Sequence, residues 1–184
     1  MDIMIKKHYY SWADVEKMCV SIVNQMYKDN WRPDYIVGIT RGGNVPATII
    51  SNITGIRCEA LKVSLRDGES GKTGDSMLWM AEDAFGYNDG TLVTAGPLEN
   101  KILIVDDIND TGATFNWIMN DWKSGCLPDH LRWNNIFGNN VRFATLTDNL
   151  ASEFNSKISY TCHEVNKAEE DVWLVYPWEN VGEY

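Results

Sequence analysis

Two adjacent carboxylates follow an apolar run in the middle of the chain, and a short polar turn comes soon after them. Residues 102–105 are all apolar, Asp106 and Asp107 come next, and residues 110–114 read Asp-Thr-Gly-Ala-Thr. Hydroxyl groups and free backbone amides suit a phosphate, whereas carboxylates repel phosphate and accept hydrogen bonds from neutral hydroxyls. A phosphate site beside a site for a vicinal diol would be complementary to a ribose 5-phosphate.

A strand, a turn and a helix are needed to position these groups. Residues 101–105 predict a buried strand, and a helix is expected from Ala113 to Trp122. Gly112 has no side chain and tolerates a positive φ, so the backbone can approach a ligand closely there. Ligands of α/β folds bind at the carboxyl ends of parallel strands, where the helix dipole favours an anion. The turn over residues 110–114 is therefore a candidate phosphate site.

The remaining segments alternate between strand and helix patterns. A capping box at Ser11 and Asp14 precedes an amphipathic helix over residues 12–28, and the apolar run 34–39 enters the turn Thr40-Arg41-Gly42-Gly43. Further elements are expected as a helix over 45–53, strands over 58–65, 141–147, 158–162 and 171–175, and short strands near Met77–Met80 and Thr91–Thr94. This alternation predicts an α/β domain with a mostly parallel central sheet flanked by helices.

Composition restricts the class of protein and its partners. The 184 residues suffice for one domain, and 16 Lys and Arg against 26 Asp and Glu give a formal charge of −10. An acidic chain without a basic run is a poor partner for nucleic acid, and no apolar run is long enough to span a membrane. The four cysteines are widely spaced, so we expect free thiols in the cytoplasm rather than disulfides.

Three segments, in a fixed order, resemble the type I phosphoribosyltransferases. Residues 105–114, VDDINDTGAT, resemble the signature loop of that family, and residues 40–43 resemble its pyrophosphate loop. Residues 171–179, DVWLVYPWE, resemble the closing segment of the xanthine-guanine and hypoxanthine branch. The resemblance implies a single phosphoribosyltransferase domain over residues 1–184. It also implies a flexible lid at 66–99, an insertion at 123–140, and a base-binding hood at 158–184 to which the N-terminus contributes.

The resemblance further implies a reaction in which a purine ring nitrogen displaces pyrophosphate from phosphoribosyl pyrophosphate bound with Mg²⁺. Asp106 and Asp107 would hold the ribose diol, directly or through the metal. The other implied contacts are Thr111, Gly112, Ala113 and Thr114 to the 5-phosphate, Arg41 and Gly42 to the pyrophosphate, and Trp173 and the Leu174 backbone to the base. Asp110 would contact the imidazole ring and accept its proton. The family commonly forms homodimers or homotetramers.

One departure from the purine branch leaves the acceptor open. That branch usually has a lysine directly after the strand that corresponds to 141–147, where it holds the six-position oxygen, but residues 145–149 read Thr-Leu-Thr-Asp-Asn. Thr147 or Asn149 could make a neutral contact, a lysine could come from elsewhere in the chain, or the base could be of another kind. A rival hypothesis is a regulator that binds phosphoribosyl pyrophosphate without consuming it, against which the acidic charge argues.

Overall fold

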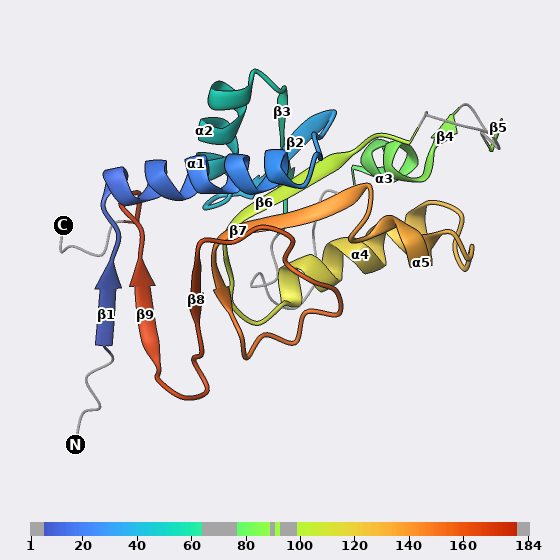
Figure 1. Ribbon diagram of the computed structural model, residues 1–184. Helices are drawn as coiled ribbons and strands as arrows, with labels where there is room; N and C mark the ends of the chain where they lie inside the picture. Colours follow the sequence, from blue (N-terminus) through green and yellow to red (C-terminus); the bar gives the residue numbers. More distant parts are fainter. Residues whose placement is uncertain (1–5, 64–76, 89–90, 93–98, 180–184) are drawn as a thin grey trace.

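The computed structural model describes residues 6–63, 77–88, 91–92 and 99–179 (Figure 1). Its central sheet has five parallel strands in the order β3-β2-β6-β7-β8. These strands are β2 (Tyr35–Thr40), β3 (Cys58–Lys62), β6 (Ile102–Asn109), β7 (Val141–Asn149) and β8 (His163–Val165). The α/β class with a parallel sheet is thereby confirmed.

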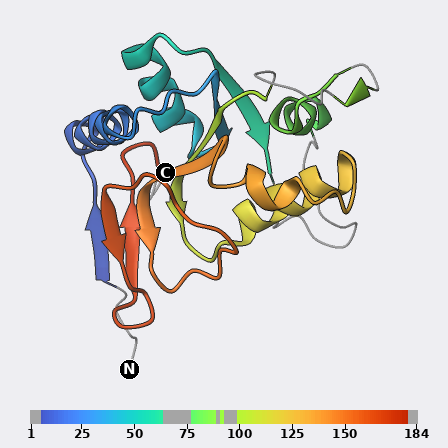
Figure 2. The ribbon, with the colours of Figure 1, turned by 45° about the vertical axis from the view of Figure 1, so that its right-hand side comes forward.

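Two smaller sheets accompany the central one. Strand β1 (Lys6–Tyr9) pairs in parallel with β9 (Val172–Val175), so segments near both ends of the chain lie side by side (Figures 1 and 2). This terminal sheet matches the hood of the expected fold, although β1 itself had not been predicted. Strands β4 (Tyr87–Asn88) and β5 (Thr91–Leu92) form an antiparallel pair.

Helices cover both faces of the central sheet. Helices α1 (Trp12–Lys28) and α2 (Asn44–Thr54) pack on one face, and α3 (Leu78–Phe85), α4 (Ala113–Gly125) and α5 (Trp133–Ile136) pack on the other (Figure 2). Alternate strand residues enter the two cores: Ile36, Leu103 and Val105 face α1 and α2, whereas Val37, Ile102 and Ile104 face α3 and α4. Burial on both faces explains why these strands read as continuous apolar runs.

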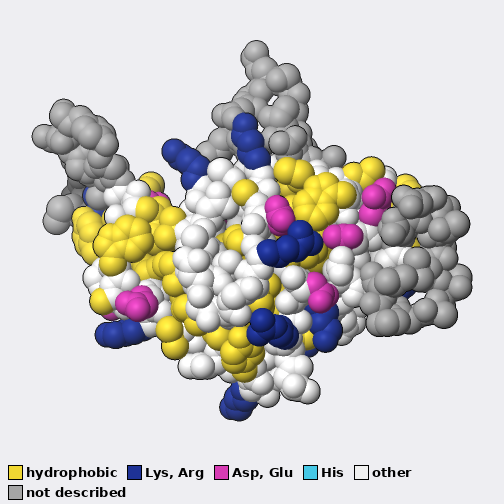
Figure 3. All heavy atoms as spheres, turned by 90° about the horizontal axis from the view of Figure 1, so that it is seen from above, with side chains coloured by type: hydrophobic (Ala, Val, Ile, Leu, Met, Phe, Trp, Pro, Cys, Tyr) yellow, Lys and Arg dark blue, Asp and Glu magenta, His cyan; other side chains and the backbone are white. Residues whose placement is uncertain are grey.

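The face formed by α1 and α2 carries exposed hydrophobic side chains. Trp12, Val20 and Tyr27 on α1 and Ile53 on α2 are each exposed. Figure 3 looks onto this side of the molecule, where hydrophobic groups lie among scattered acidic and basic ones. In the part of the chain that the structure describes, no helix has the length and apolarity required to cross a bilayer.

The segment at Met77–Met80 is a helix, and the prediction of a short strand there was wrong. Helix α3 buries Met80, Ala81, Ala84 and Phe85 in the core beneath the sheet. That spacing follows one face of a helix, which ends at Gly86 with φ +74°. The apolar run at its start is too short to distinguish helix from strand. The other residues of the expected lid, 66–76, 89–90 and 93–98, lie outside the described residues.

Three strand boundaries also differ from the prediction. Strand β6 continues to Asn109, so the two carboxylates lie within the strand rather than beyond its end. The strand expected over 158–162 was wrong: Tyr160 makes only an isolated bridge to Ala144, and β8 begins at His163. Strand β3 ends at Lys62, and Val63 is no longer part of it, while residues 64 and 65 of the predicted strand lie outside the described residues.

Candidate active site

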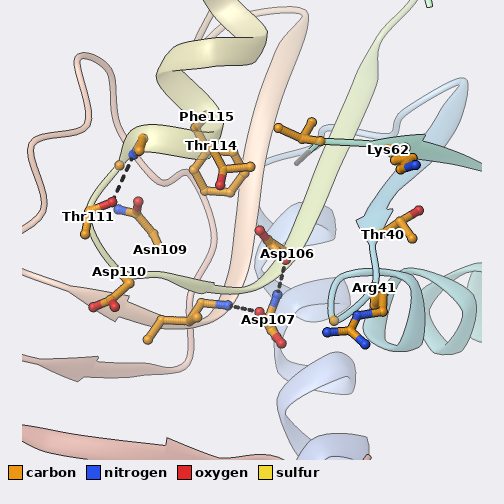
Figure 4. Close-up of a pocket in the computed structure, with 15 residues that line it drawn as sticks. Thr40, Arg41, Lys62, Asp106, Asp107, Asn109, Asp110, Thr111, Thr114 and Phe115 are labelled. Atoms are coloured by element: carbon orange, nitrogen blue, oxygen red, sulfur yellow. Dashed lines mark hydrogen bonds between the residues drawn. The ribbon is translucent and has the colours of Figure 1, made fainter. Parts of the chain in front are cut away.

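A cleft of about 750 Å³ opens at the carboxyl ends of β2, β3 and β6. Figure 4 shows Thr40, Arg41 and Lys62 on one wall, Asp106 and Asp107 between the walls, and the β6–α4 turn on the other. Its lining includes nearly all of the predicted site residues: Arg41, Gly42, Asp106, Asp107, Asp110, Thr111, Gly112, Ala113 and Thr114. The fold therefore brings together residues that are up to about seventy positions apart in sequence, because parallel strands end at one edge of the sheet.

The β6–α4 turn presents the first backbone amides of α4 to the cleft, of which the Ala113 amide donates to the Thr111 hydroxyl at 3.3 Å. Gly112 precedes α4 with φ +84° and supplies no side-chain cap. A Cβ on Gly112 would lie 2.7 Å from the Cα of Phe154, so both conformation and space require glycine here. The first-turn amides of a helix have no intrahelical acceptor, and the helix dipole adds partial positive charge at this end. Such a turn can bind one phosphate group.

The acid pair lies partly buried between the two walls. The Asp107 amide donates to Asp106 Oδ1 at 2.9 Å, and the Ile108 amide donates to Asp107 Oδ1 at 2.8 Å. Burial raises the pKa of both carboxyls, and the charge of Asp107 raises the pKa of Asp106 further. Among the described residues neither carboxylate has a basic partner, so the pair favours ligands that donate hydrogen bonds or carry positive charge.

The β2–α2 turn closes against the acid pair through two glycines. A Cβ on Gly42 would lie 2.5 Å from Asp107 Cγ, and a Cβ on Gly43 would lie 2.9 Å from the Cα of Asp106. Both distances are shorter than real Cβ contacts: a side chain at Gly43 would meet the backbone of β6, whereas one at Gly42 would displace the Asp107 carboxylate. Arg41 is exposed, follows a cis peptide bond, and points into the cleft beside Asp107 (Figure 4). The wall therefore combines a cation with backbone groups.

Lys62 belongs to the cleft, although the sequence analysis did not select it. It is the last residue of β3 and pairs in register with Thr40 at the end of β2. Its exposed ammonium adds a second cation to the wall that carries Arg41. Its position near the carboxyl end of a predicted strand could have identified it, but that strand was expected to continue to residue 65.

Asp110 has a basic partner from another part of the chain. Its Oδ1 lies 2.9 Å from the Nζ of Lys167, which follows β8, and its backbone carbonyl accepts a hydrogen bond of 2.8 Å from Asn149 Nδ2. Asn149 is the last residue of β7 and is buried. Asp110 is thus held at the cleft edge by contacts from the two neighbouring segments.

The terminal sheet contacts the acid pair through Tyr176. The Tyr176 hydroxyl donates to the Asp107 backbone carbonyl at 3.0 Å and lies 2.9 Å from the Thr147 hydroxyl. Its ring stacks between Tyr10 and Trp178, at centroid distances of 4.9 Å to each. Tyr176 was missed as a site residue, although it stands in the aromatic segment 171–179 that the sequence analysis had singled out.

Trp173 and Leu174 lie outside the lining of the cleft. Trp173 is 54% exposed on β9, and Leu174 points to the other side of that strand and is buried in the core. Their roles in base binding stay predictions.

Comparisons with known proteins point to one family. The family described as "Phosphoribosyl transferase domain" matches residues 4–177. The chain is 23% identical to xanthine phosphoribosyltransferase 1 of Saccharomyces cerevisiae, covering 95% of this chain and 90% of that protein. It is 25% identical to hypoxanthine-guanine phosphoribosyltransferase of Schizosaccharomyces pombe, covering 93% and 88%.

Solved structures show the same fold. A purine phosphoribosyltransferase from Pyrococcus horikoshii superposes with a TM-score of 0.63 at 20% identity, covering 98% of both chains. The family match spans nearly the whole chain and includes the acid pair, the β6–α4 turn and the β2–α2 turn. The chain therefore belongs to the phosphoribosyltransferase family.

Proposed function

We propose that this protein transfers the 5-phosphoribosyl group from phosphoribosyl pyrophosphate to a purine base, namely guanine, xanthine or hypoxanthine, and releases pyrophosphate. The observation that carries the proposal is one cleft in which the β6–α4 turn, a partly buried acid pair and a basic wall meet. The named activities of the two yeast relatives support a purine as the acceptor.

The substrate would lie across the cleft from one wall to the other. The amides and hydroxyls of residues 111–114 would hold the 5-phosphate, and the acid pair would accept hydrogen bonds from the ribose hydroxyls. Arg41 and Gly42 would bind the pyrophosphate on the opposite wall, with Lys62 as an additional cation. This arrangement would fix the anomeric carbon between leaving group and base, which is the main contribution expected of the protein.

During transfer, the bond from the anomeric carbon to pyrophosphate breaks and a bond to a purine ring nitrogen forms. Pyrophosphate leaves with the bonding electron pair, and the ring proton passes to Asp110. Positive charge that develops on the sugar would be stabilised by the nearby carboxylates of Asp106 and Asp107. Catalysis by this chain would consist of positioning and charge compensation.

The acid pair fits Mg²⁺. The described residues contain no group of three acidic, His or Cys side chains placed to hold a metal. Mg²⁺ commonly takes one or two carboxylates and completes its coordination with water and substrate phosphates. Asp106 and Asp107 would hold the ion, directly or through ribose hydroxyls, and it would neutralise charge on the pyrophosphate.

The test is pyrophosphate release from the purified protein with phosphoribosyl pyrophosphate, Mg²⁺ and one base at a time. Release with guanine, xanthine or hypoxanthine supports the proposal. Release only with a different base would leave the transfer and change the acceptor. Tight binding of phosphoribosyl pyrophosphate with no release in the presence of any base would instead favour the regulator.

We further propose a cytoplasmic homodimer or homotetramer that binds no nucleic acid. The exposed apolar groups of α1 and α2 support self-association, and the net charge of −10 argues against a polyanionic partner. Light scattering coupled to size-exclusion chromatography measures the oligomeric state.

A further inference from the structure

The backbone of Asp107 is held by side chains rather than by neighbouring strands. Strand β2 pairs with β6 only as far as Val105, and the register of β6 with β7 passes from Asp106 directly to Ile108. Within the part of the chain that the structure describes, Asp107 therefore has no register partner on either side. Its amide donates to the Asp106 carboxyl, and its carbonyl accepts from the Tyr176 hydroxyl at 3.0 Å. A residue that carries one of the two cleft carboxylates thus depends on a hydroxyl from the segment after β9.

Three hydroxyl groups form a continuous row that begins at Tyr176. The Tyr176 hydroxyl lies 2.9 Å from that of Thr147 on β7, which lies 3.1 Å from the hydroxyl of Tyr10, between β1 and α1. All three side chains are buried, and we call them the hydroxyl row. At its far end, the Tyr10 hydroxyl forms a hydrogen bond with Nδ1 of His163 on β8. The hydroxyl row therefore connects β8 and the segments beside the terminal sheet to the acid pair.

Protons can be placed along the hydroxyl row in one direction only. A carbonyl oxygen accepts and never donates, so the single proton of the Tyr176 hydroxyl points to Asp107. Thr147 must then donate to Tyr176, and Tyr10 must donate to Thr147, because each hydroxyl has one proton. The Tyr10 oxygen is left as an acceptor, so its hydrogen bond with His163 requires a proton on Nδ1.

The position of the His163 proton matters because this ring is neutral at neutral pH. Burial lowers the pKa of His163 below its ordinary value of 6.5, and the charge of His8 lowers it further. The centroids of the two rings are 5.5 Å apart. A neutral imidazole carries one proton, and either ring nitrogen can hold it. The hydroxyl row therefore assigns the Nδ1–H form to His163.

We propose that the Tyr176 hydroxyl positions the acid pair for the ribose hydroxyls, and that His163, as the Nδ1–H donor, sets the direction of the hydroxyl row that holds it. This inference rests on the proposed phosphoribosyl transfer. Tyr176 is not among the residues that line the cleft, so it acts through the backbone of Asp107 rather than by contact with substrate. Each hydrogen bond of such a row polarises the next, with a gain of about 10–30% per bond. The effect on the acid pair is therefore largest for Tyr176 and smaller for His163.

The direction of the hydroxyl row is tested by the tautomer of His163, which is measured without substrate. The chain has three histidines, so ¹⁵N NMR of the labelled histidines gives three sets of ring signals, and His163→Asn identifies the set that belongs to His163. At about pH 8, where the His163 ring is neutral, we expect a directly bound proton on Nδ1 and none on Nε2. A proton on Nε2 would overturn the assigned direction.

The positioning role is tested by Tyr176→Phe, which keeps the ring between Tyr10 and Trp178 and removes only the hydroxyl. The matched control is Tyr35→Phe, because Tyr35 is also fully buried, donates to Asp83 at 3.1 Å and is not part of the cleft lining. Loss of one neutral hydrogen bond predicts a roughly 2- to 13-fold weaker calorimetric affinity of Tyr176→Phe for phosphoribosyl pyrophosphate with Mg²⁺. Tyr35→Phe should bind as the wild type does, although both variants should lose similar thermal stability.

Three further variants separate the members of the hydroxyl row. Thr147→Val removes the middle hydroxyl at nearly constant shape, should weaken binding less than Tyr176→Phe, and takes its place if Tyr176→Phe does not fold. His163→Asn keeps an N–H donor near the position of Nδ1 and should bind as the wild type does. His163→Leu has no donor, so it should bind more weakly than His163→Asn.

Three binding results would overturn the inference. Unchanged affinity in Tyr176→Phe, with a wild type that binds, would refute the positioning role and leave the proposed function standing. An equal loss in Tyr35→Phe would show that the effect is not specific to the acid pair. Equal affinities of His163→Asn and His163→Leu would remove His163 from the positioning role.

Failure of the proposed function gives a different pattern. If the wild type binds phosphoribosyl pyrophosphate but releases pyrophosphate with no base, the proposed transfer fails, and the affinities of the variants decide the inference alone. A wild type that does not bind phosphoribosyl pyrophosphate would refute the proposed function and the positioning role together.

Discussion

Replacement of Gly42 by alanine tests whether Asp107 holds the ribose. A Cβ at this position would lie 2.5 Å from Asp107 Cγ and nearer still to Oδ2, well inside the 3.4 Å at which ordinary contact begins. Because the atoms in the way belong to a rotatable side chain, we expect the Asp107 carboxylate to turn aside rather than the backbone to shift.

The expected loss is functional rather than structural. A hydrogen bond to a charged group contributes about 1.5–3 kcal/mol, which corresponds to a roughly 10- to 150-fold fall in kcat/KM for phosphoribosyl pyrophosphate. Rotation of the Asp107 side chain would break the hydrogen bond that it accepts from the Ile108 amide, which destabilises the fold. It would also move the Asp107 charge away from Asp106, which reduces their repulsion and stabilises the fold. These two effects oppose each other, so we expect the melting temperature of Gly42→Ala to stay within about 2 °C of wild type.

Gly55→Ala is the matched control. Gly55 ends α2 with φ +70°, and a Cβ there would meet nothing within 4 Å. The left-handed conformation costs a non-glycine residue about 1–2 kcal/mol, so this variant should melt roughly 2–8 °C lower with unchanged kinetics. Pyrophosphate release and thermal unfolding are measured on both variants. Wild-type kcat/KM in Gly42→Ala would refute the role given to Asp107, and an equal kinetic loss in Gly55→Ala would show that the effect is not local.

Three further variants test the rest of the site. Asp106→Asn combined with Asp107→Asn should abolish transfer yet stabilise the ligand-free fold at neutral pH. The raised pKa values of Asp106 and Asp107 mean that, above about pH 4, the folded state binds more protons than the unfolded chain. The unfolding free energy of the wild type therefore falls as the pH rises above this value. Thermal melts from pH 4 to 8 should show this fall in the wild type and not in the double variant. Asp110→Asn should lower kcat about 100-fold with little change in calorimetric binding of phosphoribosyl pyrophosphate, and an unchanged kcat would exclude it as the proton acceptor. Gly112→Ala, at φ +84° and against Phe154, should lower the melting temperature by at least about 3 °C and weaken binding of the 5-phosphate, as fluorescence melts and calorimetry would show.

The sequence predicted the parts of the site that depend on local chemistry. The acid pair, the Thr-Gly-Ala-Thr turn and the Arg-Gly-Gly turn each carry their residue types in a short segment, and the structure brings all three into one cleft. Helix α1 was predictable for the same reason, because its capping box and apolar spacing are both local.

The contacts that depend on distant pairing were not predictable in this way. Lys167 reaches Asp110 only because β8 pairs with β7, and β8 begins beyond the strand expected over 158–162. Lys62 was overlooked because the strand was expected to continue past it to residue 65. Helix α3 was missed because only its burial against the sheet separates it from a strand.

The pairing of β1 with β9 has a consequence for how the protein is made. Lys6–Tyr9 leaves the ribosome before the strands of the central sheet, and its partner Val172–Val175 leaves after all of them. The central sheet can assemble as its strands emerge, whereas Tyr176 reaches the backbone of Asp107 only after all five strands of that sheet have been made. A nascent chain therefore contains the whole β6–α4 turn well before Tyr176 can form its hydrogen bond to the neighbouring acid pair.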